Sequence, residues 1–292
     1  MKNSILLFTL FLFGIQIHGQ ENKTIQFFQT DWGRTSSWDV FCEKTHKEGY
    51  DGIEIWLPRD EKAQMQLKGA LKKYNLKLGL LNGTNKSIPF EESLKGYGQH
   101  LRKLASWSPE YINCHTGSDF FSFEQNKAFI DLANKISKET NIPIYHETHR
   151  GRFSFNLPAT KTYISQIPEL KLNLDISHWM VVHESLLENQ DQDLLDVINR
   201  THHLHARVGH AQGPQVNDPE APEWKDAVNR HVDIWEKIIR RNWETSNNFT
   251  LTTEFGPADY MPTLPYTRLP VANQWKANLY MMKVIKERLN IE

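Results

Sequence analysis

Short β-rich segments alternate with longer amphipathic segments along almost the whole chain, and this alternation restricts the folds available to it. The β-rich segments lie at 24–30, 52–56, 76–82, 111–115, 142–147, 170–175, 202–208 and 249–255. Segments with apolar residues at helical spacing follow them, at 37–47, 59–74, 90–107, 124–140, 160–166, 186–199, 224–242 and 271–289. Eight strands, each followed by a helix, over about 260 residues predict an α/β fold, a single-domain (β/α)8 barrel.

An open doubly wound sheet is the alternative for the same order of elements. That fold carries a glycine-rich phosphate-binding turn after its first strand. Here the segment 24–30 continues into the sequence TDWGRTSSW, and no GxGxxG spacing occurs in the chain. The sequence therefore favours the barrel, in which the long loop 209–223 is a candidate functional loop.

The N-terminal residues have the pattern of a secretory signal peptide. Lys2 precedes an apolar run from Ile5 to Ile17, and the small Gly19 offers a cleavage point. A transmembrane anchor is the alternative, but the run is short for a bilayer span. We expect residues 1–19 to be a signal peptide, residues 20–292 to form the barrel, and the mature protein to be secreted or periplasmic without stable membrane insertion.

Charge and cysteine content narrow the classes of function. Lys and Arg total 34 against 35 for Asp and Glu, so no overall positive field attracts nucleic acid or anionic lipid. Cys42 and Cys114 are the only cysteines, which is neither a disulfide framework nor a metal-type spacing, and the sequence leaves open whether they are bridged. Binding must come from a local site, and we expect no nucleic-acid partner.

Acidic and imidazole side chains lie at the C-terminal ends of most predicted strands, where catalytic groups gather in this fold. In strand order they are Glu54, His115, Glu147, Asp175, His205 with Arg207, and Glu254. Any one of them alone is most simply a hydrogen-bonded loop residue. Several carboxylates on one rim repel one another unless a positive charge lies between them, and a divalent cation is the simplest such charge.

The candidate ligands of that cation are Glu147, Asp175, His205 and Glu254. Three carboxylates and one imidazole suit Mn²⁺, our first choice, or Mg²⁺, and they tolerate Zn²⁺ or Co²⁺. The number of carboxylates argues against a purely structural zinc site. We therefore expect one divalent metal ion at the barrel rim.

The strand 202–208 alternates so that His203, His205 and Arg207 share one face, while His202 points the other way. If His205 is a metal ligand, His203 lies one layer below it as a packed residue or as a partner of the ligand. Arg207 then lies at the rim, within reach of a bound oxyanion. His210 belongs to the following loop and is a candidate for lining the pocket.

Four segments together resemble the xylose isomerase-like barrel superfamily, over essentially the whole mature chain: IYHETHRG (144–151), LDISHW (174–179), HLHAR (203–207) and TTEFG (252–256). That superfamily includes sugar isomerases and epimerases, dehydratases, and DNA-repair endonucleases of the AP endonuclease family 2 type. The resemblance implies a metal on Glu147, Asp175, His205 and Glu254, with the two glutamates as catalytic acid and base. It also implies that His178 and Arg207 contact substrate oxygens.

Further substrate-binding candidates lie beside these motifs, with simple packing as the alternative for each: His149, His115, His210, Glu54 and Trp32. Two features depart from the ketose epimerases. HRGR follows Glu147, where those enzymes carry a further glutamate, and the loop after Gly209 is longer than the basic loop expected there.

The sequence thus predicts a metal-dependent sugar isomerase or epimerase that works through an enediolate on a free or oxidised carbohydrate. A lyase or dehydratase acting on keto sugars or 3-keto glycosides is the first alternative, and a non-catalytic sugar-binding barrel is the second. A DNA-repair endonuclease fits poorly, because the third predicted strand ends without histidine and no Asp-x-His follows His205. The oligomeric state stays open, a homo-oligomer included.

Overall fold

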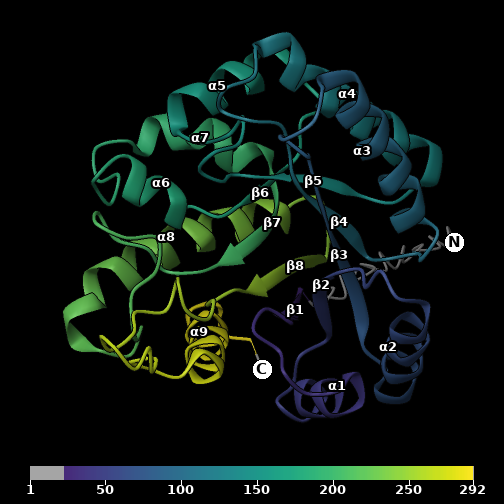
Figure 1. The fold of residues 1–292 in the computed structure, drawn as a ribbon. Coiled ribbons are helices and arrows are strands. Elements are labelled where there is room, and N and C mark those ends of the chain that lie inside the picture. The colour runs from purple at the N-terminus through teal and green to yellow at the C-terminus, as the bar shows by residue number, and fades with distance from the viewer. Residues whose placement is uncertain (1–22, 292) are drawn as a thin grey trace, which may run out of the picture.

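The computed structural model describes residues 23–291, which form a closed barrel of parallel strands enclosed by helices (Figure 1). The strands are β1 (Thr24–Thr30), β2 (Gly52–Trp56), β3 (Lys77–Gly83), β4 (Tyr111–His115), β5 (Ile144–Glu147), β6 (Leu172–Leu174), β7 (Thr201–Ala206) and β8 (Asn248–Thr253). Each strand pairs with the next along the chain, and β8 pairs with β1 to close the barrel. The predicted single-domain (β/α)8 barrel is confirmed, while the expected signal peptide lies outside the described residues.

Helices cover the outside of the barrel. They are α1 (Trp38–Lys47), α2 (Glu61–Tyr74), α3 (Phe90–Ala105), α4 (Phe123–Thr140), α5 (Leu157–Gln166), α6 (Ser177–Val182), α7 (Asp191–Arg200), α8 (Lys225–Asn242) and α9 (Gln274–Leu289), with a 3-10 turn η1 (Pro222–Trp224) before α8. Side chains of Ser37, Asp60, Ser122, Asn156 and Asn273 accept hydrogen bonds from the first turns of their helices, which explains where these helices begin. The sequence predicted one helix between β6 and β7, and the structure has two.

Apolar side chains pack between the strands and the helices, whereas the barrel interior contains many polar ones. Two clusters of buried apolar residues occupy the outer layer, one around Trp235 and one around Phe129. Inside the barrel, the Tyr111 hydroxyl lies 3.0 Å from Thr252 Oγ1, and its ring centroid lies 4.2 Å from that of His203. Cys42 and Cys114 are buried and unbridged. None of the helices described is both long and apolar enough to cross a bilayer.

A glycine on β3 leaves the space that the Tyr111 ring fills. Gly79 is paired with Tyr111 across β3 and β4, and a Cβ at position 79 would lie 2.5 Å from the Tyr111 Cζ and hydroxyl oxygen. We expect Gly79→Ala to destabilise the protein by about 2–3 kcal/mol, because the ring has no space to move into. Gly69→Ala is the control, since nothing lies within 4 Å of that helical position, and it should stabilise by about 0.5–1 kcal/mol. Urea denaturation giving equal midpoints for the two variants would contradict this packing.

A buried neutral histidine links stability to pH. His231 on α8 donates from Nδ1 to the Ala227 carbonyl at 2.8 Å and accepts at Nε2 from the Gly209 amide at 3.2 Å. Burial lowers its pKa from 6.5 to about 4. Between pH 6.5 and pH 4 the imidazole is therefore protonated in the unfolded chain but neutral in the folded protein. The stability that His231 contributes above pH 6.5 is lost as the pH falls toward 4.

Between pH 7 and about pH 4.5, we expect His231 to account for a loss of about 2 kcal/mol in the free energy of unfolding. Urea unfolding at both pH values measures this. The His231→Gln variant, less stable at pH 7, should lose correspondingly less free energy of unfolding on acidification. An unchanged pH dependence in His231→Gln would be the contrary result.

Candidate metal and substrate site

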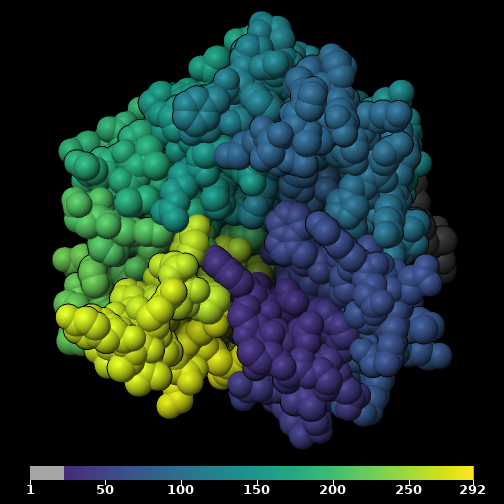
Figure 2. All heavy atoms as spheres, viewed as in Figure 1, coloured from purple at the N-terminus to yellow at the C-terminus, as the bar shows by residue number. Residues whose placement is uncertain are grey.

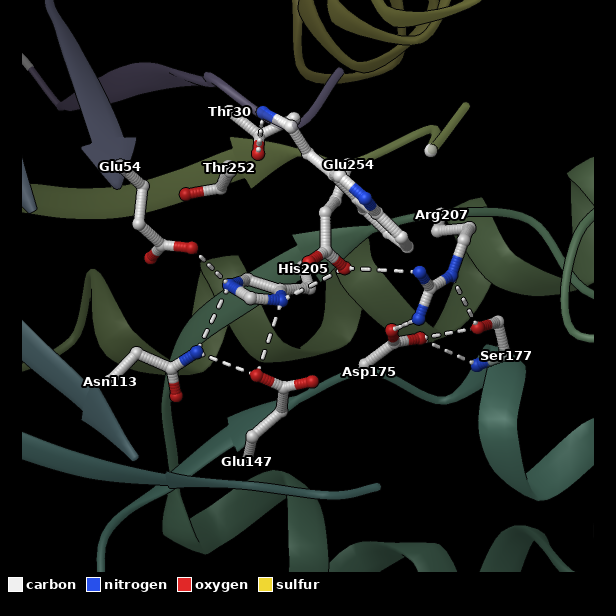
Figure 3. A network of polar contacts seen from close by, with 12 residues as sticks. Thr30, Glu54, Asn113, Glu147, Asp175, Ser177, His205, Arg207, Thr252 and Glu254 are labelled. Carbon is white, nitrogen blue, oxygen red and sulfur yellow. Dashed lines mark hydrogen bonds and ion pairs between the residues drawn. The ribbon is translucent and has the colours of Figure 1, made fainter. Parts of the chain in front are cut away.

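The structure brings the four predicted metal ligands together at the C-terminal ends of the strands. Glu147 ends β5, Asp175 follows β6, His205 lies on β7 and Glu254 follows β8. One ligand atom of each residue lies within 4.8 Å of the others, and all four side chains are buried (Figure 3). Parallel strands in a closed barrel place their carboxyl ends on one rim, so residues more than 100 positions apart become neighbours.

His205 is held by carboxylates on both sides of its ring. Its Nε2 lies 2.7 Å from Glu54 Oε1, and its Nδ1 lies 3.0 Å from Glu254 Oε2 and 3.5 Å from Glu147 Oε2. Burial alone would raise the pKa of Glu54, but the neighbouring His205 and His203 hold that pKa below its usual range. A carboxylate on Nε2 fixes the proton there and leaves the Nδ1 lone pair for a metal ion.

The charges and hydrogen bonds of this cluster fit a divalent cation. His205 Nδ1 and Glu254 Oε2 are buried, and neither forms a hydrogen bond of good geometry with a described residue. Burial would lower the pKa of His205, but Glu254, Glu54 and Glu147 raise it well above its usual value. The three carboxylates therefore favour a positive charge next to Nδ1. A hard divalent ion supplies that charge and prefers an oxygen-rich donor set of this kind.

Arg207 supplies a second positive charge beside the cluster. Its guanidinium contacts Asp175 Oδ2, donates from Nε to Ser177 Oγ at 3.1 Å and lies 3.4 Å from Glu254 Oε2 (Figure 3). Burial raises the pKa of Asp175 to about 7. Arg207 acts to lower this pKa, while the nearby carboxylates of Glu254 and Glu147 act with burial to raise it. Arg207 thus partly neutralises two of the candidate ligands.

A cavity of about 420 Å³ opens onto the cluster. Six of the predicted site residues line it, namely Trp32, His115, Glu147, His149, Arg207 and Glu254, together with Asp31, Trp56 and Tyr260 among others. On the face shown in Figure 2, segments from the start, middle and end of the chain meet around a central hollow. The size and the mixture of aromatic and polar walls suit a small polar ligand.

Two histidines occupy the wall nearest Glu147. His115 Nε2 lies 2.9 Å from Glu147 Oε2. The His149 ring centroid lies 4.9 Å from that of His115 and 3.8 Å from that of His178. Burial lowers the pKa of His149 to about 3, so His149 faces the cavity as a neutral hydrogen-bonding group.

Three residues predicted to contact substrate do not line this cavity. His178 is fully buried, with Nε2 2.8 Å from Arg207 Nη2. Glu54 lies beside His205, where it pairs with the imidazole. His210 forms a bridge with Gly213 in its loop, and its ring lies 4.6 Å from that of Trp224. Each of these side chains is instead engaged by another part of the protein, across the barrel for Glu54 and within its own loop for His210.

Sequence reasoning missed Asn113 on β4. Its Nδ2 donates to Glu147 Oε2 at 2.6 Å and lies 3.3 Å from His205 Nε2. The available signal was its position two residues before His115, on the same face of the strand. Tyr260 was also missed, because it belongs to an irregular segment after β8 where periodicity gives no orientation.

The carboxylate that holds His205 is the basis of a prediction. We expect Glu54→Gln to weaken Mn²⁺ binding by roughly 10–100-fold, because the amide no longer fixes the imidazole with a negative charge. Isothermal titration calorimetry with Mn²⁺ measures the change, and Glu92→Gln on the exposed side of α3 is the control. Equal affinities for these two variants would exclude the proposed role of Glu54.

The fold and the rim define a (β/α)8-barrel protein with a buried candidate metal centre next to a cavity. A family model described as a xylose isomerase-like TIM barrel matches residues 42–238, and the chain belongs to this family. Comparison with curated protein sequences found no significant match.

Solved structures with the same fold include proteins of different activity. The 3-keto-D-glucoside 4-epimerase YcjR from E. coli is 15% identical with a TM-score of 0.61, and the match covers 90% of this chain and 100% of the YcjR chain. The probable 3-DHS dehydratase AsbF from Bacillus anthracis is 16% identical with a TM-score of 0.59, covering 91% and 100%. A xylose isomerase-like TIM barrel protein from Mycobacterium smegmatis in complex with magnesium is 12% identical with a TM-score of 0.56, covering 90% and 97%. At these identities the likeness concerns the fold.

Proposed function

We propose that this protein is a divalent-metal-dependent sugar isomerase or epimerase that moves a proton beside the carbonyl of a keto sugar. The observation that carries the proposal is that Glu147 and Glu254 line one cavity and both face His205 Nδ1. When bound by Glu147, Asp175, His205 and Glu254, a divalent ion supplies a Lewis acid that makes the C–H bond next to a carbonyl more acidic.

The two glutamates would perform the proton transfers. One carboxylate takes the proton from carbon to give an enediolate, and the other returns a proton to the same carbon or to its neighbour. Both glutamates have a hydrogen-bonding or charged group beside them, since His115 Nε2 lies 2.9 Å from Glu147 Oε2 and Arg207 Nη1 lies 3.4 Å from Glu254 Oε2. Arg207 and His149, which line the cavity, would hold substrate oxygens.

Elimination is the second candidate reaction, because it begins with the same proton abstraction. The structural neighbours support both readings, since one is a 3-keto-D-glucoside epimerase and another a probable dehydratase. The departure HRGR after Glu147 also loosens the likeness to ketose epimerases. We propose free or oxidised carbohydrates as substrates, and a secreted or periplasmic location that follows from the expected signal peptide.

Deuterium exchange tests the proposal. Mn²⁺-loaded protein is incubated in D₂O with a panel of ketoses and 3-keto glycosides and followed by NMR. We expect exchange at a carbon next to the carbonyl of at least one sugar, and loss of that exchange when the metal is chelated. Sugar binding without exchange would favour a non-catalytic sugar-binding barrel, and exchange that survives chelation would contradict the role of the metal.

A further inference from the structure

A second and larger cavity adjoins the candidate site. Its volume is about 940 Å³, against about 420 Å³ for the cavity at the metal cluster. Thr30, Asp31 and Trp32 line both, so the two cavities meet at the end of β1. The larger one lies between the start of α1 and the segment that joins β8 to α9.

We infer that the substrate is a glycoside or oligosaccharide, whose keto-sugar unit occupies the smaller cavity and whose second unit, a sugar or an aromatic aglycone, occupies the larger one. The inference rests on the proposed function, since it takes the reacting sugar to lie at the metal cluster. A single sugar ring needs only the smaller cavity, and a pocket as large as the second takes a further ligand unit of comparable or greater size.

The walls of the larger cavity carry the groups that bind carbohydrate. Phe41 is buried and packs edge-to-face with Trp275, with ring centroids 6.1 Å apart, and the Lys44 ammonium lies over the Trp275 ring, 3.7 Å from its centre. Arg34 and Gln274 add polar groups. Trp32, which lines both cavities and is 37% exposed, offers apolar contact to a sugar or a flat aglycone, while the polar side chains bind hydroxyls.

The junction between the cavities is fixed by packing and hydrogen bonds and bears one carboxylate, Asp31. Trp32 is 37% exposed and packs edge-on against Tyr260, with ring centroids 4.8 Å apart. Its backbone carbonyl accepts a hydrogen bond from Gln274 Nε2 at 2.8 Å. Gly33 follows with φ of +84°, where a Cβ would lie 3.1 Å from Gln274 Oε1, so the turn requires glycine. Asp31 lies 3.6 Å from Arg34 Nε and faces both cavities, where it can accept hydroxyls from either unit of the ligand.

Binding of matched glycosides tests the inference without requiring turnover. The probes are methyl and p-nitrophenyl glycosides of glucose, galactose, mannose and xylose, titrated into Mn²⁺-loaded protein by calorimetry. For at least one sugar, we expect the p-nitrophenyl glycoside to bind about tenfold more tightly than its methyl partner, because the aryl ring reaches the larger cavity. Affinities within twofold for every pair would overturn the inference.

Substitutions locate the effect. Trp275→Ala removes an aromatic wall, and Ala272→Trp fills the same cavity without removing core packing. Both should abolish the p-nitrophenyl advantage and leave methyl glycoside binding unchanged, whereas Leu195→Trp, on the exposed side of α7, should change neither. An advantage that survives Ala272→Trp would place the aryl group elsewhere and overturn the inference.

The outcomes separate this inference from the proposed function. Deuterium exchange on keto sugars, without any preference for the longer glycoside, would leave the proposed function standing and remove the second binding site. A preference located to the larger cavity, without exchange on any keto sugar, would keep the binding site and remove the proposed proton transfer.

Discussion

Glu147→Gln and Glu254→Gln should each slow deuterium exchange at carbon by roughly 10²–10⁴-fold, the range that positioned acid–base groups contribute. Each substitution keeps the size of the side chain and a carbonyl oxygen, but it removes the group that accepts or returns the proton. Both carboxylates line the cavity, so each has direct access to a bound sugar. The rate is measured by NMR in D₂O with Mn²⁺ at saturation.

Metal content and a matched variant make this result specific. Each variant is assayed only after its bound Mn²⁺ has been quantified, so that slower exchange is not confused with metal loss. Glu92→Gln on α3 changes the same functional group on the protein surface and should exchange at the wild-type rate. Exchange above a tenth of the wild-type rate in both cavity variants would rule out the assigned acid and base.

Arg207→Met should destabilise the metal-free protein by about 3–5 kcal/mol, the usual cost of breaking a buried ion pair. Arg207 is 1% exposed, and without its charge the carboxylates of Asp175, Glu254 and Glu147 repel one another. Added Mn²⁺ should restore part of the loss, since the ion brings positive charge to the same carboxylates. Urea midpoints measured in EDTA and in Mn²⁺ give both quantities.

The control for this prediction is a surface arginine. Arg288 pairs with Asp233 and Glu236, but its side chain is 46% exposed. Arg288→Met should cost at most about 1 kcal/mol, with no difference between EDTA and Mn²⁺. A similar response of the two variants to Mn²⁺ would show that Arg207 does not share carboxylates with the metal.

The strands and their order were predictable because each β-rich segment is bounded by turn residues and followed by a helical pattern. The structure differs from the predicted order of elements where the helices and strands are short. β6 covers only Leu172–Leu174, and α6 has six residues, too few for a periodic signal. That helix begins where Asp175 Oδ1 accepts from the Ser177 amide at 3.0 Å, a local contact that hydrophobic spacing cannot reveal.

The candidate metal ligands were predictable because barrel topology places the ends of consecutive strands on one rim. The orientation of their partners was not. Glu54 meets His205 across the barrel, from β2 to β7, and neither residue's local sequence encodes that distance. The orientation of His210 is set within its own loop. The loop folds back through a bridge between His210 and Gly213, and the imidazole packs against the Trp224 ring.

The central claim is that one divalent ion binds between Glu147, Asp175, His205 and Glu254. Crystals grown with Mn²⁺ and measured at its absorption edge locate the ion directly. We predict a single anomalous peak at this cluster, with the imidazole nitrogen and carboxylate oxygens at about 2.0–2.3 Å. An ion bound by other residues, or no peak at the cluster under saturating Mn²⁺, would contradict the account.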